Sequence, residues 1–124
     1  LVSCGLFDEE IAALALAHKE KILERNRAIL AANLPILDAW VKREPHVSYV
    51  RPTAGTMALV HYDLPIGSRD FCRRMYEETG AFCVPGDCFD EPFSFRVGYG
   101  HEADVLRKGL DAVSGFISRV RGVK

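Results

Sequence analysis

The longest regular pattern in the sequence is helical and contains no breaking residue. From Asp8 to about Ala32, apolar residues recur every three or four positions without a Gly or Pro, which is the periodicity of an amphipathic α-helix. The same phase continues to Val41, although Pro35 removes a backbone donor, so we expect the helix to bend or restart near Ala31. A helix of this length is unusual in a small isolated domain and is typical of a connector between two domains.

Shorter patterns after this helix alternate between strand and helix types. After the long helix they predict strands at 46–50 and 56–64, joined as a hairpin, and a helix at about 69–79. A short strand within 81–89, a strand at 93–100 and a helix at about 102–121 follow. Ser68 is a suitable N-cap and Gly80 a suitable stop for the middle helix, and the pair Pro85 and Gly86 suits a type II turn. We therefore predict an α+β fold, with a small, mostly antiparallel sheet covered by helices and a long N-terminal connector helix.

Size and charge limit what the chain can be. Its 124 residues suffice for one folding unit with a single core, so 1–124 is predicted to be one domain. The 16 basic and 17 acidic residues give a formal net charge of -1, which predicts neither a nucleic-acid nor a membrane surface. No apolar run approaches the roughly 18 residues that span a bilayer, so we expect a cytoplasmic protein without a signal peptide or anchor. The first residue is Leu1 and not Met, so we expect a processed chain or a piece of a longer one.

The residues with reactive side chains form no recognisable catalytic or metal-binding pattern. The four cysteines contain no C-x-x-C pair, so we expect reduced thiols and no metal site. Cys88 near the Pro-Gly pair has no evident partner base, which disfavours a nucleophile. His18 lies on the apolar stripe of the long helix and is predicted to be a core or interface residue. No histidine has a carboxylate or nucleophile partner at recognisable spacing, so we assign no catalytic residue in this chain.

Arg96 is the residue that most clearly suggests binding. It lies in the segment FSFRVGYG, where period-2 alternation places Phe95 and Val97 on one face and Ser94, Arg96 and Gly98 on the other. A strand arginine that faces solvent is common, and alternation alone favours that reading. Small neighbours on the same face leave room for a ligand, however, and a shielded guanidinium must be matched by an anion. Its planar fork suits a carboxylate held by two parallel hydrogen bonds.

Four segments together resemble a known family. They are, in chain order, RNRAILAANLPIL, RPTAGTMALV, GAFCVPGDCF and FSFRVGYGHEADVLRKGLDAVSGFI, and the resemblance to which they belong extends from about residue 8 to 120. They are similar to the C-terminal small domain of the fold type I pyridoxal-phosphate-dependent aminotransferases, in particular the class I and II, aspartate-aminotransferase-like members. Each segment alone is a weak signal, whereas an arginine in an R-x-G-x-G context after the other three is rather specific.

The resemblance implies a role for Arg96 and a missing partner domain. In that family the arginine of the last strand binds the α-carboxylate of the substrate, and Arg96 is the matching position. The lysine that forms the Schiff base with pyridoxal 5'-phosphate belongs to the family's large domain. None of the five lysines here lies in a matching context. We therefore expect no cofactor-binding residue in this chain, a large cofactor-binding domain upstream in the same polypeptide, and the long helix as the connector to it.

The expected function follows from the family. The complete protein is predicted to be an aminotransferase of amino acid metabolism that transfers an amino group between an α-amino acid and a 2-oxo acid, as a homodimer. The chain alone is predicted to be inactive and not to hold the cofactor stably. Other pyridoxal-phosphate chemistry on the same scaffold stays open, namely a carbon-sulfur lyase, a decarboxylase or a cyclase. A non-catalytic small-ligand-binding α+β module is a further alternative. The sequence does not indicate the substrate side chain.

Overall fold

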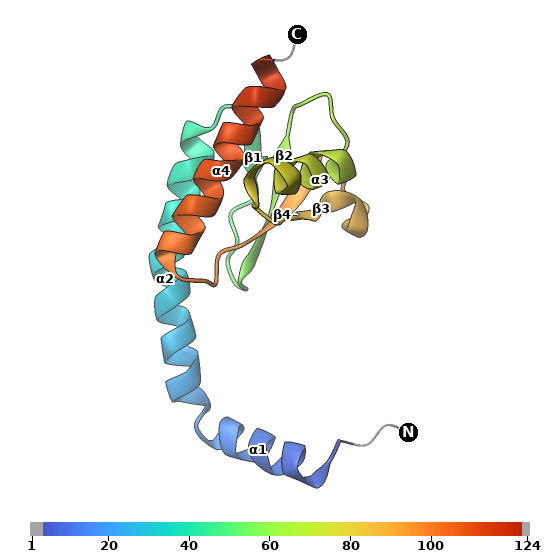
Figure 1. Cartoon of the computed structure of the whole chain (residues 1–124). Helices are drawn as coiled ribbons and strands as arrows, with labels where there is room; N and C mark the ends of the chain where they lie inside the picture. The colour runs from blue at the N-terminus through green and yellow to red at the C-terminus, as the bar shows by residue number, and fades with distance from the viewer. Residues whose placement is uncertain (1–3, 123–124) are drawn as a thin grey trace.

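The computed structural model describes residues 4–122 as four helices around one small sheet (Figure 1). The helices are α1 (Leu6–Ala17), α2 (Lys19–Arg43), α3 (Ser68–Thr79) and α4 (Ala103–Gly122). The strands are β1 (Val47–Tyr49), β2 (Met57–Tyr62), β3 (Val84–Pro85) and β4 (Ser94–Gly98), and a 3₁₀ turn, η1, spans Gly86–Phe89. The sheet order is β1-β2-β4-β3, with every neighbouring pair antiparallel. The predicted α+β fold and the β1–β2 hairpin are therefore confirmed.

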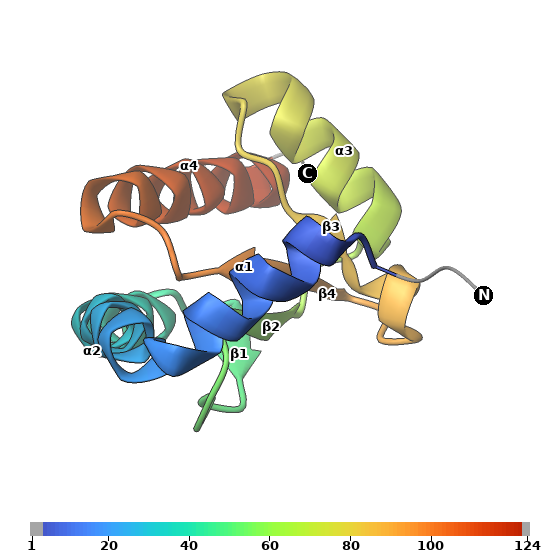
Figure 2. The same cartoon turned by 90° about the horizontal axis from the view of Figure 1, so that it is seen from below.

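The core lies between one face of the sheet and the helices α3 and α4. Figure 2 shows both helices on the same side of the sheet, with α2 beside α4. Alternate strand residues that face them are buried, among them Val60 and Phe95, each at 0% exposure. Phe71 of α3 stacks on Phe95 with ring centroids 5.3 Å apart and meets Phe116 of α4 edge to face. Within residues 4–122 no helix covers the opposite face of the sheet (Figure 2), and that face carries the candidate site.

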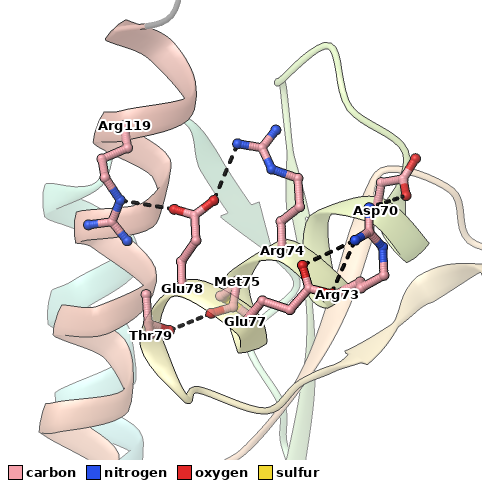
Figure 3. Close-up of polar contacts among 8 residues, drawn as sticks. All are labelled: Asp70, Arg73, Arg74, Met75, Glu77, Glu78, Thr79 and Arg119. Carbon is pink, nitrogen blue, oxygen red and sulfur yellow. Dashed lines mark hydrogen bonds and ion pairs between the residues drawn. The ribbon is translucent and has the colours of Figure 1, made fainter.

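Ion pairs lie along the surface of α3, and one of them joins α3 to α4 (Figure 3). Glu78 near the end of α3 accepts hydrogen bonds from Arg119 Nε of α4 at 3.1 Å and from Arg74 at 3.4 Å. Arg73 bonds to Asp70 and Glu77 of its own helix. Exposed pairs of this kind contribute little free energy each. The apolar contacts of α3 with the sheet are therefore what holds it in place.

The N-terminal helical region breaks at His18 and not near Ala31. His18 has φ -107° and ψ 19°, outside the helical region, and it separates α1 from α2. Helix α2 continues through Pro35 without restarting. Ala31 and Pro35 are both exposed, so water can hydrate the carbonyl that loses its helical donor. Buried Leu37 and Trp40 pack this part of α2 into the core, and that packing favours the helix over the local cost of the proline.

Helix α1 has no buried residue. Its large apolar side chains are all more than 60% exposed: Leu6, Phe7, Ile11, Leu14 and Leu16. His18 after it is also exposed, so of the two predicted roles, core or interface residue, the core role is wrong within the described residues, and the interface role stays a prediction. No helix within residues 4–122 is both long and apolar enough to cross a bilayer.

Two residues near the sheet have roles that local patterns did not predict. Ser68 begins α3 without a side-chain cap, and its hydroxyl instead accepts a hydrogen bond from the Ser94 backbone N–H at 3.3 Å. Gly86 is not part of a type II turn, because it begins the 3₁₀ turn and does not have the positive φ that this turn type requires. The predicted stop at Gly80 is confirmed, with φ 74° and a backbone bond to Tyr76.

Asn33 connects α2 to the segment that follows β4. Its side chain is 1% exposed, and its Nδ2 donates to the carbonyl oxygens of Tyr99 at 2.8 Å and His101 at 2.5 Å. These carbonyls lie between β4 and α4, where no ladder or helix bond uses them. One amide therefore satisfies two backbone acceptors and fixes where α4 begins relative to α2.

Replacement of Asn33 is expected to destabilise the domain. Asn33→Ala leaves two carbonyls without their donor and should lower the free energy of unfolding by about 1–3 kcal/mol. Asn33→Asp should cost more, because a carboxylate then faces two carbonyl oxygens. Urea unfolding measures both. The matched control is Asn26→Asp on the exposed face of the same helix, expected within about 0.5 kcal/mol of the parent. Equal effects at both positions would show that Asn33 is not the link.

Candidate functional site

Arg96 lies at the centre of β4 with strands on both sides. Its Cα partners are Leu59 of β2 and Val84 of β3, so its backbone is held in the sheet from two directions. Phe95 and Val97 on either side of it face the core and are buried. Arg96 therefore points to the face that no described helix covers, where it is half-buried. This is the face that the alternation predicted for it.

The guanidinium of Arg96 lies at a small hollow with mostly apolar walls. The hollow has a volume of about 220 Å³ and is lined by Met57, Ala58, Leu59, Phe89 and Arg96. The Cζ atom of Arg96 lies over the ring of Phe89, 4.9 Å from its centroid. Among residues 4–122, Arg96 makes no ion pair with a carboxylate. A fixed cation with a neutral, apolar surround and free donors has the chemistry of an anion-binding group.

The small neighbours of Arg96 do not both provide room for a ligand. Ser94 is fully buried, and its hydroxyl donates to the Glu91 carbonyl at 2.6 Å. The 3₁₀ turn and the loop after it cover this end of β4. Gly98 is exposed, and the imidazole Nε2 of His101 lies 3.6 Å from where a Cβ of Gly98 would be. The open space beside Arg96 is instead bordered by β2.

Three residues of the hollow were missed by reasoning on the sequence. Met57 and Leu59 alternate with buried residues of β2, so the register of β2 with β4 brings them to the face of Arg96. The period-2 alternation in the segment TMALVHYDL already places Met57 and Leu59 on one face of the strand. Pairing of β2 with β4 then brings this face beside Arg96. Phe89 comes from outside the sheet. No periodic pattern in the sequence predicts that Phe89 lies near Arg96.

Close packing at Gly86 places the 3₁₀ turn against β4. A Cβ on Gly86 would come within 1.8 Å of Ser94 Oγ and 2.1 Å of the Glu91 carbonyl oxygen. Only glycine fits at this position. The Glu91 N–H donates to the Gly86 carbonyl at 3.1 Å, and Asp90 closes the turn with φ 58°. Phe93 beyond it also has a positive φ of 55° and is 50% exposed, so it is not a strand residue as the alternation predicted.

A polar cluster ties the turn before β2 to helix α2. Asp38 accepts hydrogen bonds from the Tyr49 hydroxyl and from Arg51 Nε, the latter at 2.9 Å. These two bonds, with the Tyr49 bond first, hold the pKa of Asp38 below its usual range. Burial and the bond to Asp38 raise the pKa of Tyr49 to about 12. The cluster fixes the turn at 51–55, which borders a second shallow hollow that shares Met57 and Leu59 with the hollow of Arg96.

The other reactive side chains lie outside the hollow of Arg96. Burial raises the pKa of the Cys72 thiol to about 12 and that of Cys83 to about 11, so both stay protonated near neutrality. Contrary to the reading that no histidine has a carboxylate partner, His46 Nδ1 lies 2.6 Å from Asp63 Oδ1. That contact joins the residue before β1 to the residue after β2, away from Arg96.

The lysines of the described residues lie away from the hollow of Arg96. The four in the described part are Lys19, Lys21, Lys42 and Lys108, all exposed on α2 or α4, and Lys124 lies outside the described residues. None of the four lines the hollow of Arg96.

The known proteins that this chain resembles are aminotransferases and a further pyridoxal-phosphate-dependent enzyme. No protein-family model matches the chain. A pyridoxal-phosphate-dependent aminotransferase from Streptococcus suis is 43% identical with a TM-score of 0.89, over 94% of this chain and 31% of that one. The pyridoxal-phosphate-dependent cyclase OrfR is 27% identical with a TM-score of 0.87, over 94% of this chain and 32% of that one. A curated tyrosine aminotransferase from Caenorhabditis elegans is 25% identical over 96 residues, which are 76% of this chain and 21% of that protein.

These likenesses define the class of the chain. It corresponds to the C-terminal small domain of the fold type I pyridoxal-phosphate-dependent aminotransferases, which confirms the resemblance found in the sequence. The chain spans about a third of the length of the solved relatives and about a fifth of the curated one.

Loss of the Tyr49 hydroxyl should change how stability depends on alkaline pH. A tyrosine pKa raised to about 12 in the folded protein, against 10 in the unfolded chain, stabilises the fold fully below about pH 10. This contribution is lost as pH rises towards 12. Tyr49→Phe should therefore destabilise the domain by about 1 kcal/mol at neutral pH and flatten the alkaline decline in the free energy of unfolding. Urea unfolding at several pH values measures this.

The control for this variant is Tyr76→Phe. Tyr76 is 57% exposed on α3 and makes no side-chain hydrogen bond within residues 4–122. It should behave as the parent does at every pH. An alkaline decline in Tyr49→Phe as steep as in the parent would contradict the assigned role of Tyr49.

Proposed function

We propose that this chain is the substrate-carboxylate-binding domain of a pyridoxal-phosphate-dependent aminotransferase. The observation that carries the proposal is Arg96, a strand cation that lies half-buried at an apolar hollow and has no carboxylate partner among the described residues. The complete enzyme would transfer an amino group between an α-amino acid and a 2-oxo acid, both of which carry the α-carboxylate that Arg96 would bind. The aminotransferases among the relatives support this reaction.

The chain would contribute binding and orientation, and a further domain the cofactor. Because no described lysine borders the hollow, the groups that hold pyridoxal phosphate would come from an upstream large domain of the same polypeptide. Helix α1, whose apolar side chains are exposed, is suited to pack against it. The complete protein would act as a homodimer in the cytoplasm.

Arg96 would act by fixing the carboxylate at two points. A guanidinium fork donates two parallel hydrogen bonds to a carboxylate, which sets the direction of the bonds at the neighbouring carbon. Correct orientation of a reactant can supply a large part of a rate enhancement. The apolar walls from Met57 and Leu59 keep water away from one side of the ion pair and so strengthen it. The backbone of Arg96 is bonded into the sheet, so the clamp has a rigid base.

A second function is favoured by one specific likeness. The cyclase OrfR matches the chain over 94% of its length at a TM-score of 0.87. A cyclisation of an amino acid would need the same carboxylate clamp. The two reactions differ in their need for a second substrate: transamination consumes a 2-oxo acid, whereas cyclisation does not. Assay of the complete protein with an amino acid, with and without a 2-oxo acid, separates them.

Loss of Arg96 should weaken the binding of both substrates. In the complete protein, Arg96→Ala is expected to lower kcat/KM for amino and 2-oxo acids on the order of 100-fold, mainly through KM, because a charge-assisted bidentate contact is lost. The absorbance of the bound cofactor should be unchanged. Arg107→Ala, at an exposed position of α4, is the matched control and should retain the parent kinetics. Unchanged kinetics in Arg96→Ala would contradict the assignment.

The isolated chain should neither bind the cofactor covalently nor transaminate. Pyridoxal phosphate mixed with residues 1–124 is expected to show no stable imine absorbance, since the four described lysines are exposed and away from the hollow. Borohydride reduction followed by mass spectrometry measures covalent attachment. The complete protein is the positive control. Stoichiometric attachment to one lysine of the isolated chain would contradict the proposed division between domains.

A further inference from the structure

We propose that Phe89 is a positioning residue for Arg96: its ring holds the guanidinium plane in the orientation in which the fork meets the substrate carboxylate. This inference depends on the proposed function, since it concerns the same arginine. The inference goes beyond the proposed function because it assigns a role to Phe89, whose side chain makes no hydrogen bond and carries no charge.

Stacking and carboxylate binding use different parts of the guanidinium. The Cζ atom of Arg96 lies over the Phe89 ring at 4.9 Å from the centroid, which is within the range of a cation–π contact. In the proposed arrangement the ring lies against the flat face of the cation. Its N–H donors point outward in the plane of the group and stay available. A carboxylate that binds in this plane therefore does not compete with Phe89.

Arg96 needs such a support because little else restrains its side chain. An arginine has several rotatable bonds, and ordering it costs conformational free energy. Within residues 4–122 no carboxylate pairs with Arg96 and no side-chain hydrogen bond holds it. Its remaining neighbours at the hollow, Met57 and Leu59, are flexible aliphatic side chains. Phe89 is the one flat surface among the described residues that line the hollow.

Phe89 itself is placed by rigid backbone. It ends the 3₁₀ turn that begins at Gly86, and Gly86 lies so close to Ser94 and Glu91 that no side chain fits there. The Ser94 hydroxyl and the Glu91 N–H hydrogen-bond within this contact. The turn is thereby fixed to the start of β4, two residues before Arg96. The ring and the cation that it supports are thus held by the same strand.

The ring of Phe89 is exposed and is not part of the core. Phe89 is 43% exposed and lies outside the buried core cluster. Its truncation should therefore cost little stability, whereas the orientation of the guanidinium depends on it directly. This difference allows the role of Phe89 to be separated from folding.

The test compares three variants in the complete protein. Phe89→Leu keeps an apolar side chain but removes the flat ring, and it should lower kcat/KM for the amino acid about tenfold, mainly through KM, as expected for loss of a cation–π contact. Phe89→Tyr keeps the ring and should restore kcat/KM to within about twofold of the parent. Phe93→Leu is the matched control: its ring is 50% exposed and packs edge to face on Tyr62. That variant should keep the parent kinetics.

A second readout separates this inference from the proposed function. Calorimetric titration with 3-phenylpropionate, an unreactive monocarboxylate, reports binding without turnover. Weaker binding in both Arg96→Ala and Phe89→Leu supports the inference. If Arg96→Ala loses binding while Phe89→Leu keeps the parent affinity and kinetics, the inference is wrong and the clamp stands. If Arg96→Ala itself binds as the parent does, the proposed function is wrong. Equal loss in Phe89→Leu and Phe89→Tyr would also overturn the inference, since the ring would then not matter.

Discussion

The pairing of β2 with β4 is the interaction on which the rest of the structure depends. Its register, from Met57 opposite Gly98 to His61 opposite Ser94, decides which side chains face the helices and which face outward. Val60 and Phe95 are directed into the core by the same alternation that directs Leu59 and Arg96 to the open face. A slip by one residue would exchange the two sets. The fold and the outward placement of Arg96 therefore have one common cause.

Local pattern was sufficient to predict most elements and the placement of Arg96. The order of helices and strands, the β1–β2 hairpin and the stop at Gly80 follow from periodicity and turn chemistry over short windows. Arg96 was placed correctly because a strand's alternation is itself local. The resemblance to a known family added two expectations that periodicity does not contain: a substrate carboxylate opposite Arg96 and a cofactor-binding domain upstream.

The features that were not predicted depend on contacts between distant residues. The Ser68 hydroxyl accepts a hydrogen bond from the backbone N–H of Ser94, 26 positions away, and does not cap its own helix. The helix survives Pro35 because its neighbours are packed into the core, and it breaks at His18, where nothing in the described chain covers it. Phe89 meets Arg96 only because the turn at Gly86 docks on β4. In each of these places tertiary packing outweighs the structure that the local sequence favours.

Gly86 has a consequence for how sequence variation in this domain is interpreted. It has no side chain and takes part in no chemistry, yet any larger residue would collide with Ser94 and displace the turn that carries Phe89. In a saturation screen for activity, Gly86 would tolerate as few replacements as Arg96 does. Loss of activity on replacement of Gly86 would then result from the close packing of the turn against β4 and not from the loss of a reactive group. A map of mutational sensitivity would therefore include the turn at Gly86 as well as the surroundings of Arg96.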